Sequence, residues 1–286
     1  MPARYQTWTK NSAQSVVTHD AFPRTVVLGS KGRLGRILRI VWGNNPKIVW
    51  HARRPAPSVI GCDLLDNPEE LAQLLAPAQA VIVLAGPAGQ GGQVHADLAR
   101  AVLSARPSRA RVFLPSSAAV YGAQANPLIE NRATQPLSPY GRAKAQMEAT
   151  VQEARNVTSL RIGNVAGADA ALGGWHSEFK LDQFSDGRTP LRSYIGPIAL
   201  ANALADLVAH PGPLPSVLNV AQEPALEMGA VLDAAQLPYA HQPAPPSAIA
   251  EVSLCTKTLA RYTELNLADA KHMVSEWRAL RNFEAL

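Results

Sequence analysis

The sequence predicts an α/β fold in which a doubly wound parallel sheet is followed by a small C-terminal cap. Short apolar runs alternate with segments of helical periodicity from Thr25 to Ile162, which is the pattern of strands and crossover helices. One of these runs, Ala80–Leu84, contains no polar residue, as expected of a parallel strand that is buried on both faces. Beyond Gly163 the alternation loosens and proline-rich segments such as Pro238–Pro246 appear, so this part is expected to form the cap.

Each element follows from a local signal. The expected strands are apolar runs bounded by turn residues, and the last of them closes the sheet. They are Thr25–Leu28, Lys47–Trp50, Ser58–Cys62, Ala80–Leu84, Arg111–Leu114 and Thr158–Ile162. The segment Asn67-Pro68-Glu69-Glu70 starts a helix, since it offers an N-cap, a proline at the first position and acids in the first turn. The other expected helices end near Trp42, cover Val94–Ala105, start at Ser138 and, within the cap, cover Pro197–His210, Glu227–Ala235 and Ala268–Phe283.

These patterns divide the chain into three parts. Residues 1–24 are mixed and polar, with no apolar segment behind their positive charges, and are expected to be an appended tail rather than a signal peptide. Residues 25–165 are expected to form the sheet core, and residues 166–286 mainly the cap, with some segments that return to the core.

Composition excludes several classes of function. With 47% hydrophobic and 17% charged residues, the chain is expected to be globular rather than disordered. No apolar run approaches the ~20 residues of a membrane-spanning helix. The net charge is +5, but the basic residues are scattered, which argues against a nucleic-acid partner. The two cysteines are far apart and the seven histidines form no HxH or HxxxH pair, so we expect no metal site and a reducing, cytoplasmic location.

A glycine-rich turn follows the first expected strand. Gly29, Gly32 and Gly35 are spaced GxxGxxG and lie between that strand and a helix, the context in which such a motif binds the pyrophosphate of a dinucleotide. The first glycine permits the tight turn, the second lets the phosphate approach the backbone, and the third packs the helix against the strand. The helix N-terminus adds N–H donors and a positive dipole. A glycine-rich turn that binds nothing is the alternative interpretation.

The end of the second expected strand bears on the choice of cofactor. A carboxylate there bonds the ribose 2′-OH of NAD, whereas arginine accommodates the 2′-phosphate of NADP. The chain has Arg53 and Arg54 at this point, no acid before Asp63, and Arg33 at the start of the first helix. Since guanidinium pairs well with phosphate, we predict NADP(H) over NAD(H), with Asp63 accepting a hydrogen bond from the adenine amino group. Solvated loop charges are the alternative interpretation.

Tyr140 and Lys144 lie one turn apart on one face of the helix that starts at Ser138. The pKa of tyrosine is ordinarily near 10, and a neighbouring ammonium favours the phenolate. A lowering by about three units, which needs roughly 4 kcal/mol, makes tyrosine an acid–base group at neutral pH. Ser117 directly follows the fifth expected strand, so its hydroxyl is placed to bond the oxygen that Tyr140 protonates or deprotonates. A turn serine is the alternative interpretation of Ser117.

These motifs carry a resemblance to a known family. GxxGxxG at 29–35, SSAAVYG at 116–122, YGRAK at 140–144 and LRIGNVAG at 160–167 occur in the order seen in the extended short-chain dehydrogenase/reductases. More narrowly, the chain resembles the NAD-dependent epimerase/dehydratase family of nucleotide-sugar enzymes. The resemblance implies a Rossmann core that binds a dinucleotide, a small substrate-binding cap and a homodimer formed through the helices that flank the sheet.

The resemblance also implies roles for single residues. Tyr140 is expected to be the acid–base group, Lys144 to hold the nicotinamide ribose, and Ser117 to bind the substrate oxygen. Asn164 and Arg192, the latter in a segment similar to the family's RDYI, are expected on the substrate side. The residues expected to contact the cofactor are Gly29, Gly32, Arg33, Leu34, Gly35, Arg53, Arg54, Asp63, Ala85, Gly86, Tyr140 and Lys144.

The chain departs from the family's pattern on the substrate side. The loop at 85–92 is short and glycine-rich, and the helix asparagine usual in the family is not evident at 94–105. His95 is expected to be a solvated histidine at the start of that helix, and contact with the substrate is the alternative interpretation. Gly196 and Ala199 replace the usual histidine and aspartate downstream of the RDYI segment. The cap is also shorter than in typical sugar epimerases. None of these changes disturbs the redox core.

The leading hypothesis is an NADP-preferring oxidoreductase or epimerase that acts on the secondary alcohol or carbonyl of a sugar, nucleotide sugar or related small molecule. One alternative is a simple NADPH-dependent carbonyl reductase with no nucleotide-sugar site. A second is a non-catalytic NADP(H)-sensing module, against which the complete set of Ser117, Tyr140 and Lys144 counts.

Overall fold

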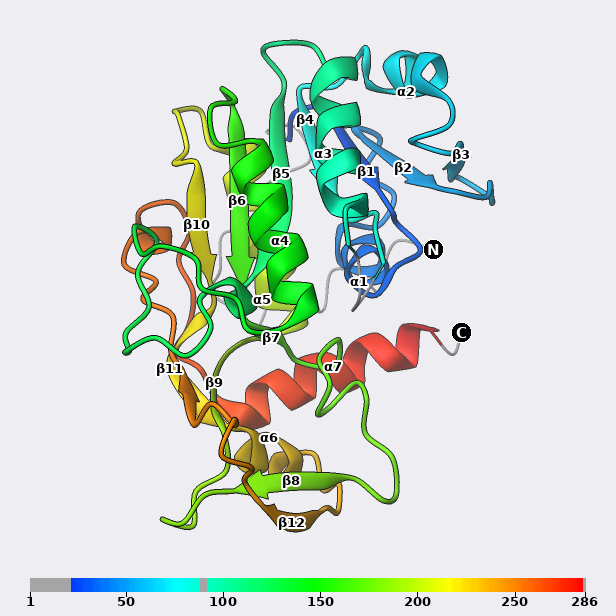
Figure 1. The fold of residues 1–286 in the computed structure, drawn as a ribbon. Coiled ribbons are helices and arrows are strands. Elements are labelled where there is room, and N and C mark those ends of the chain that lie inside the picture. The colour runs from blue at the N-terminus through cyan, green and yellow to red at the C-terminus, as the bar shows by residue number, and fades with distance from the viewer. Residues whose placement is uncertain (1–21, 88–91, 285–286) are drawn as a thin grey trace.

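The computed structural model describes residues 22–87 and 92–284, and its centre is a seven-stranded parallel sheet. The strand order is β10-β6-β5-β4-β1-β2-β3, from left to right in Figure 1. The strands are β1 (Thr25–Leu28), β2 (Ile48–Ala52), β3 (Ile60–Gly61), β4 (Ala80–Val83), β5 (Arg111–Ser117), β6 (Val157–Ile162) and β10 (Val217–Val220). Residues 1–21 of the expected tail and residues 88–91 of the expected glycine-rich loop lie outside the described residues.

The sheet is doubly wound, which confirms the fold class expected from the sequence. β1 pairs in parallel with β2 on one side and with β4 on the other. From β1 the chain adds β2 and β3 outward, then returns to β4 and adds β5 and β6 in the other direction. Ligands of open α/β sheets bind in the crevice at the carboxyl ends of the strands, beside such a reversal.

Helices cover both faces of this sheet, with apolar side chains packed against the strands. On one face lie α2 (Pro68–Leu75), α3 (Val94–Ala105) and α4 (Pro139–Thr150), and on the other α1 (Arg33–Trp42) and α5 (Pro197–Ala209). Leu71 and Leu98 are buried on the first face, Leu38 and Leu200 on the second. Because apolar side chains meet both faces, every residue of β1 and of β4 is buried.

The prediction that Thr158–Ile162 is the last strand of the sheet was wrong. β10 pairs in parallel with β6, with Leu218 opposite Leu160. α5 is one of the segments after residue 165 that return to the core, where Leu204 and Leu207 are fully buried. An edge strand presents unpaired N–H and C=O groups, and β10 satisfies those of β6 from a distant part of the chain.

The third strand is shorter than the predicted Ser58–Cys62. Only Ile60 and Gly61 pair with β2. The preceding residues make a tight turn, in which Ser58 has φ of +58° and Ala56 bridges to Val59. The apolar run therefore contains a turn as well as a strand.

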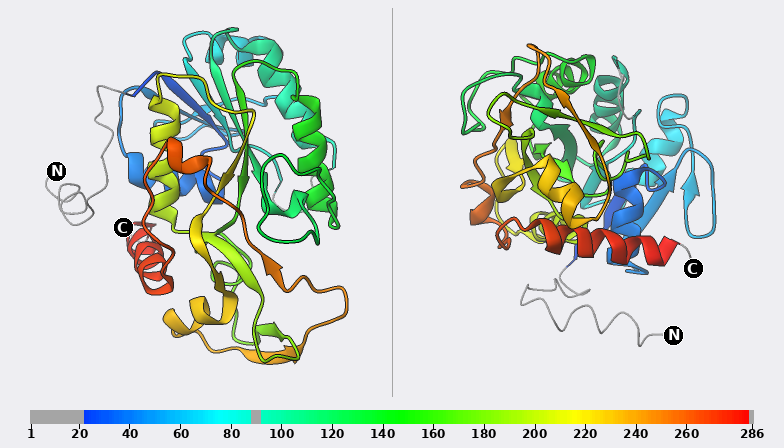
Figure 2. Two further views of the ribbon diagram at one scale, coloured as in Figure 1. Left: turned by 90° about the vertical axis from the view of Figure 1, so that its left-hand side faces the viewer. Right: turned by 90° about the horizontal axis from the view of Figure 1, so that it is seen from below.

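The cap lies at the carboxyl edge of the sheet, below it in Figure 1. Its main part is a four-stranded sheet of β7 (Asn164–Val165), β9 (Leu191–Ile195), β11 (Gln222–Glu227) and β13 (Glu251–Val252). β8 (Lys180–Gln183) and β12 (Ala240–Pro243) pair in parallel at the end farthest from the central sheet (Figure 2). The remaining elements are α6 (Met228–Ala234), α7 (Ala270–Glu284) and the short 3₁₀ helices η1 (Ala118–Val120) and η2 (Leu259–Arg261).

Candidate active site

The glycine-rich turn after β1 forms a cradle at the start of α1. Gly29 has φ of +88°, and a Cβ on it would lie 2.5 Å from the backbone nitrogen of Ala85, so only glycine fits there. A Cβ on Gly35 would lie 2.6 Å from the carbonyl oxygen of Gly29. Gly32 is the N-cap of α1 and makes no side-chain cap, which leaves N–H groups of the first turn for an anion. The Ser30 hydroxyl is buried with no hydrogen-bond partner among the described residues. These features fit a dinucleotide pyrophosphate.

Three basic residues meet where β2 ends. Arg53 and Arg54 follow β2 directly, and Lys31 donates from Nζ to the carbonyl oxygen of Arg54 at 3.2 Å. The side chain of Arg53 is 84% exposed, and its Nε lies 3.5 Å from Oδ2 of Asp63. The Asp63 carboxylate also accepts the N–H of Leu65 at 3.1 Å. Lys31 was missed from the sequence, although it precedes the second glycine of the motif.

The other expected cofactor residues take different positions. The Arg33 side chain donates to the carbonyl oxygen of Ala168 at 3.0 Å, so it ties α1 to the loop after β7. Leu34 is partly buried and packs against the core. Ala85 supplies the backbone that Gly29 approaches, and Gly86 follows it with φ of +126°.

Tyr140 and Lys144 are brought to this edge by α4. Ser138 caps the helix by accepting the N–H of Gly141 at 3.0 Å. Tyr140 is half-buried and hydrogen-bonds to the hydroxyl of Ser117 at the end of β5. Burial raises the pKa of Tyr140, and the bond to Ser117 lowers it by less. The net direction is opposite to the lowering expected from the sequence, because burial disfavours the phenolate more than the bond to Ser117 favours it. The Lys144 ammonium lies 5.7 Å from the centre of the Tyr140 ring.

Lys144 is almost fully buried beside Tyr140. Its side chain donates from Nζ to the carbonyl oxygen of Pro115 at 2.8 Å and lies 3.3 Å from Nδ1 of His95. Burial lowers the pKa of Lys144 to about 8, and the charge of Glu148 raises it by less.

His95 contradicts the prediction of a solvated histidine. It is 5% exposed, and its ring lies edge-on to that of Tyr140 with the ring centres 6.4 Å apart. Burial first, and the Lys144 charge second, lower the pKa of His95 to about 4. Its place in the first turn of a helix that follows a carboxyl-edge loop is the signal behind the alternative interpretation, in which His95 lies near the crevice.

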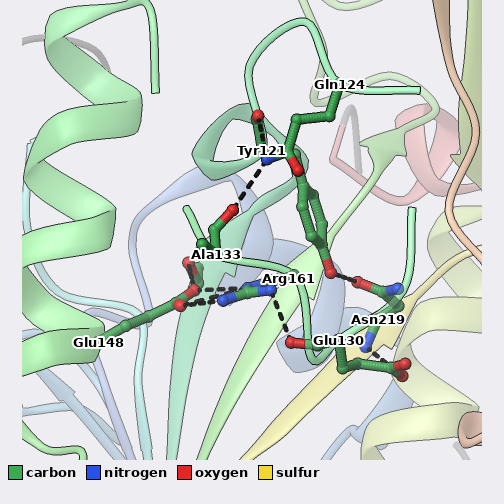
Figure 3. Close-up of polar contacts among 8 residues, drawn as sticks. Tyr121, Gln124, Glu130, Ala133, Glu148, Arg161 and Asn219 are labelled. Carbon is green, nitrogen blue, oxygen red and sulfur yellow. Dashed lines mark hydrogen bonds and ion pairs between the residues drawn. The ribbon is translucent and has the colours of Figure 1, made fainter. Parts of the chain in front are cut away.

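A buried polar network lies next to Lys144 along α4, and Figure 3 shows its contacts around Arg161 and Glu148. Arg161 of β6 pairs with Glu148, four residues after Lys144, with Nη2 2.7 Å from Oε2, and both side chains are less than 10% exposed. Glu148 also accepts the hydroxyl of Ser116. The Arg161 guanidinium stacks 4.6 Å from the centre of the Tyr121 ring. The network therefore fixes α4 against β5 and β6.

Asn164 and Arg192, which are expected on the substrate side, form hydrogen bonds within the cap. Asn164 hydrogen-bonds to the hydroxyl of Tyr194, which donates to Asp169 at 3.2 Å. Burial raises the pKa of Tyr194. Arg192 donates to the carbonyl oxygens of Leu191 and Ile249, each at 2.8 Å. Within the described residues, no hydrogen bond joins Asn164 or Arg192 to Ser117, Tyr140 or Lys144.

No group of three or more His, Cys, Asp and Glu side chains that could hold a metal ion occurs in residues 22–87 and 92–284. In the same ranges, no helix is long and apolar enough to cross a membrane.

Comparisons with known proteins agree with this architecture. The family model described as the NAD dependent epimerase/dehydratase family matches residues 25–176. No curated protein matches the sequence. Among solved structures, the UDP-glucose 4-epimerase from Brucella ovis in complex with NAD is 18% identical, with a TM-score of 0.75 over 90% of this chain and 98% of that one.

Two other solved structures are similar. The UDP-glucose-4-epimerase from Stenotrophomonas maltophila with bound NAD and formylated UDP-arabinopyranose is 19% identical, with a TM-score of 0.72 over 92% of this chain and 99% of that one. The NAD-dependent NDP-hexosamine 5,6-dehydratase TunA is also 19% identical, with a TM-score of 0.71 over 92% and 98%. At these identities the likeness shows the fold, while the family model covers more than half of the chain. The chain belongs to the NAD-dependent epimerase/dehydratase family of extended short-chain dehydrogenase/reductases.

Proposed function

We propose that the protein is an NADP(H)-preferring oxidoreductase or epimerase that acts on the secondary alcohol or carbonyl of a sugar, nucleotide sugar or related small molecule. The observation that carries the proposal is the convergence of Ser117, Tyr140 and Lys144 at the carboxyl edge of the sheet. The glycine-rich cradle lies at the same edge. Family membership supports a nicotinamide dinucleotide as the cofactor, which supplies or accepts the hydride when bound.

The chain's own residues handle the proton. In the reducing direction, the hydroxyls of Ser117 and Tyr140 bind the carbonyl oxygen of the substrate, and Tyr140 gives its proton to that oxygen as it becomes an alkoxide. The nearby Lys144 ammonium stabilises the phenolate that is left. In the oxidising direction the phenolate takes the alcohol proton. Burial of these groups strengthens their electrostatic interactions.

Replacing the phenol hydroxyl tests this mechanism. We expect Tyr140→Phe to keep its affinity for NADPH and to lose at least about 100-fold in turnover, since general acid–base catalysis contributes about 10²–10⁴. Turnover is followed by NADPH absorbance with a panel of UDP-sugars and free carbonyl compounds, after mass spectrometry of any ligand that co-purifies. Tyr262→Phe is the matched control, because the Tyr262 ring lies edge-on to His210, away from the site. Equal turnover in Tyr140→Phe and wild type would refute the proposed chemistry.

The preference for NADP(H) is proposed from the basic residues at the end of β2. The exposed guanidinium of Arg53, with Arg54 and Lys31 beside it, supplies positive charge where the 2′-phosphate would lie. We expect the double substitution Arg53→Ala/Arg54→Ala to weaken NADPH binding by about 10- to 100-fold, given roughly 1.5–3 kcal/mol for a charged hydrogen bond. NADH binding stays within about threefold of its wild-type affinity.

Fluorescence titration with both cofactors measures this preference. Arg109→Ala is the matched control, because Arg109 lies exposed before β5, at the amino end of the sheet. Wild-type protein that binds NADH as tightly as NADPH would show that the arginines are solvated loop charges.

One observation favours a second candidate function, a carbonyl reductase without a nucleotide-sugar site. The guanidinium of Arg192, expected on a nucleotide phosphate, is already bonded to the backbone of residues 191 and 249. Such a reductase would turn over free carbonyl compounds equally well after Arg192→Ala. A stopped-flow search that detects no hydride transfer with any compound would instead favour the non-catalytic sensing module.

We also propose that the chain forms a homodimer through the outer faces of α3 and α4. Val94 and Leu137, at the starts of these helices, are exposed apolar residues, 38% and 61% accessible. Sedimentation equilibrium measures the oligomeric state.

A further inference from the structure

The surroundings of Lys144 include a partner that the sequence did not predict. An ammonium group has three donors and no acceptor. One donor goes to the carbonyl oxygen of Pro115, and a second is directed at Nδ1 of His95, 3.3 Å away. The carboxylate of Glu148, one turn further along α4, is committed to Arg161 and Ser116. His95 is therefore the side chain on which the lysine nitrogen depends for its second hydrogen bond.

The contact between Lys144 Nζ and His95 Nδ1 determines the protonation state and tautomer of the histidine. Because the ammonium can only donate, Nδ1 must be unprotonated in this contact, and the neutral ring then carries its proton on Nε2. Nε2 is buried and has no hydrogen-bond partner among the described residues. A neutral ring agrees with the lowered pKa of His95, since burial and the Lys144 charge both disfavour imidazolium. A hydrogen bond from the His95 ring to the backbone carbonyl of Pro87 raises the pKa of His95 by a smaller amount.

His95 is held in place from three directions. It belongs to the first turn of α3, and its ring lies edge-on to Tyr140 at an angle of 78°. On the third side lies Gly86, where an added Cβ would come within 2.7 Å of Nδ1 and Cε1. A glycine in the loop after β4 thus gives the imidazole room to reach Lys144.

We propose that His95 is a positioning residue for Lys144, whose ammonium it orients beside Tyr140 and stabilises by accepting a hydrogen bond at Nδ1. The inference rests on the proposed function, since it assigns His95 a role in the same site. The titratable and charged groups around the lysine nitrogen are His95 from α3, Tyr140 and Glu148 from α4, and Arg161 from β6 through Glu148. β5 contributes only the carbonyl of Pro115 directly.

Two substitutions of His95 separate a role as hydrogen-bond acceptor from a role in packing alone. His95→Asn keeps an acceptor close to the place of Nδ1, whereas His95→Leu keeps apolar volume and removes the acceptor. Loss of a hydrogen bond to a charged group changes the pKa of that group by about one unit. We expect the pKa of Lys144 to fall by about one unit in His95→Leu and to stay near the wild-type value in His95→Asn.

The titration is measured by NMR of the lysine side-chain Cε and Nζ in the full chain, with the Lys144 signal assigned from Lys144→Arg. A Lys144 that titrates at the wild-type pH in His95→Leu overturns the proposal, as does an equal shift in both variants. This result does not depend on turnover. Wild-type turnover in Tyr140→Phe would refute the proposed function, but it would say nothing about the Lys144 titration in the His95 variants. The two failures are therefore distinguishable.

A measurement on the unaltered protein makes the test independent of how the variants fold. The ¹⁵N shifts of the His95 ring report its protonation and tautomer. We expect the neutral form with the proton on Nε2 from about pH 5.5 to pH 8. An imidazolium in this range, or a proton on Nδ1, would contradict the proposed hydrogen bond.

Discussion

At the scale of single residues, Lys144 combines burial with a positive charge. Its side chain is 7% exposed, and burial lowers its pKa from 10.5 to about 8. Between pH 8 and 10.5 the unfolded chain binds the proton more tightly, so stability rises with pH across this window. Below pH 8, holding the charge costs up to about 3 kcal/mol. This is the kind of local destabilisation that functional sites tolerate.

Removing this charge is therefore expected to stabilise the protein. We expect Lys144→Met to raise the free energy of unfolding at pH 7 by about 1–2 kcal/mol, less than the full effect because the bond to Pro115 is lost. The gain shrinks toward pH 10, where the wild-type lysine is neutral. Urea denaturation at several pH values measures it, with exposed Lys257→Met as the control. A Lys144→Met protein that is less stable than wild type at pH 7 would contradict the argument.

At the scale of elements, the C-terminal helix α7 caps the N-terminus of α5. Gly196 is the N-cap of α5 and has no side chain to offer. Glu276 of α7 supplies the carboxylate instead, and its Oε2 accepts the N–H groups of Ile198 and Ala199 at 2.9 and 3.3 Å. A Cβ on Gly196 would lie 2.2 Å from this oxygen. Gly196 and Ala199, the two residues that differ from the family's pattern, thus lie where the start of α5 contacts α7.

Loss of this cap is expected to destabilise the fold. We expect Glu276→Ala to lower the free energy of unfolding by about 1–2 kcal/mol, as for the loss of an N-cap with a charged acceptor. Chemical denaturation measures the change. Ser275→Ala, at an exposed position of the same helix, is the matched control. Equal stability of Glu276→Ala and wild type would show that α7 does not hold α5 through this carboxylate.

At the scale of the whole molecule, the sheet is completed by segments that follow residue 165. β10 covers the edge of β6, and α5 covers one face with Leu200, Leu204 and Leu207, all fully buried. The buried hydroxyl of Tyr121 also depends on β10, because it donates to Asn219 at 2.7 Å. The core therefore includes residues far into the second half of the chain.

A fragment that ends at residue 165 is therefore expected not to fold. It would leave the edge of β6 unpaired and one face of the sheet bare of α5. We expect the 1–165 fragment to lack a cooperative thermal transition by circular dichroism, while the full chain shows one. A cooperative transition in the fragment would support a core that ends near residue 165.

Much of the fold could be predicted because its signals are local. α3 was expected at Val94–Ala105, where it lies, since its boundaries follow from periodicity along one segment. Tyr140 and Lys144 were expected on one face of a helix because four residues make about one turn. The same holds for the glycine spacing, which needs only a strand before it and a helix after it.

The sequence by itself thus determined the doubly wound sheet, the glycine-rich turn and the Tyr140–Lys144 pair. Only the tertiary structure decided which distant residues complete them: His95 beside Lys144, Lys31 beside Arg54, and Glu276 at the start of α5. Helical and strand periodicity act over a few residues, so a single chain segment reveals them. Contacts such as that between His95 and Lys144 join segments far apart in the chain, and burial and charge at those contacts exist only once the chain has folded.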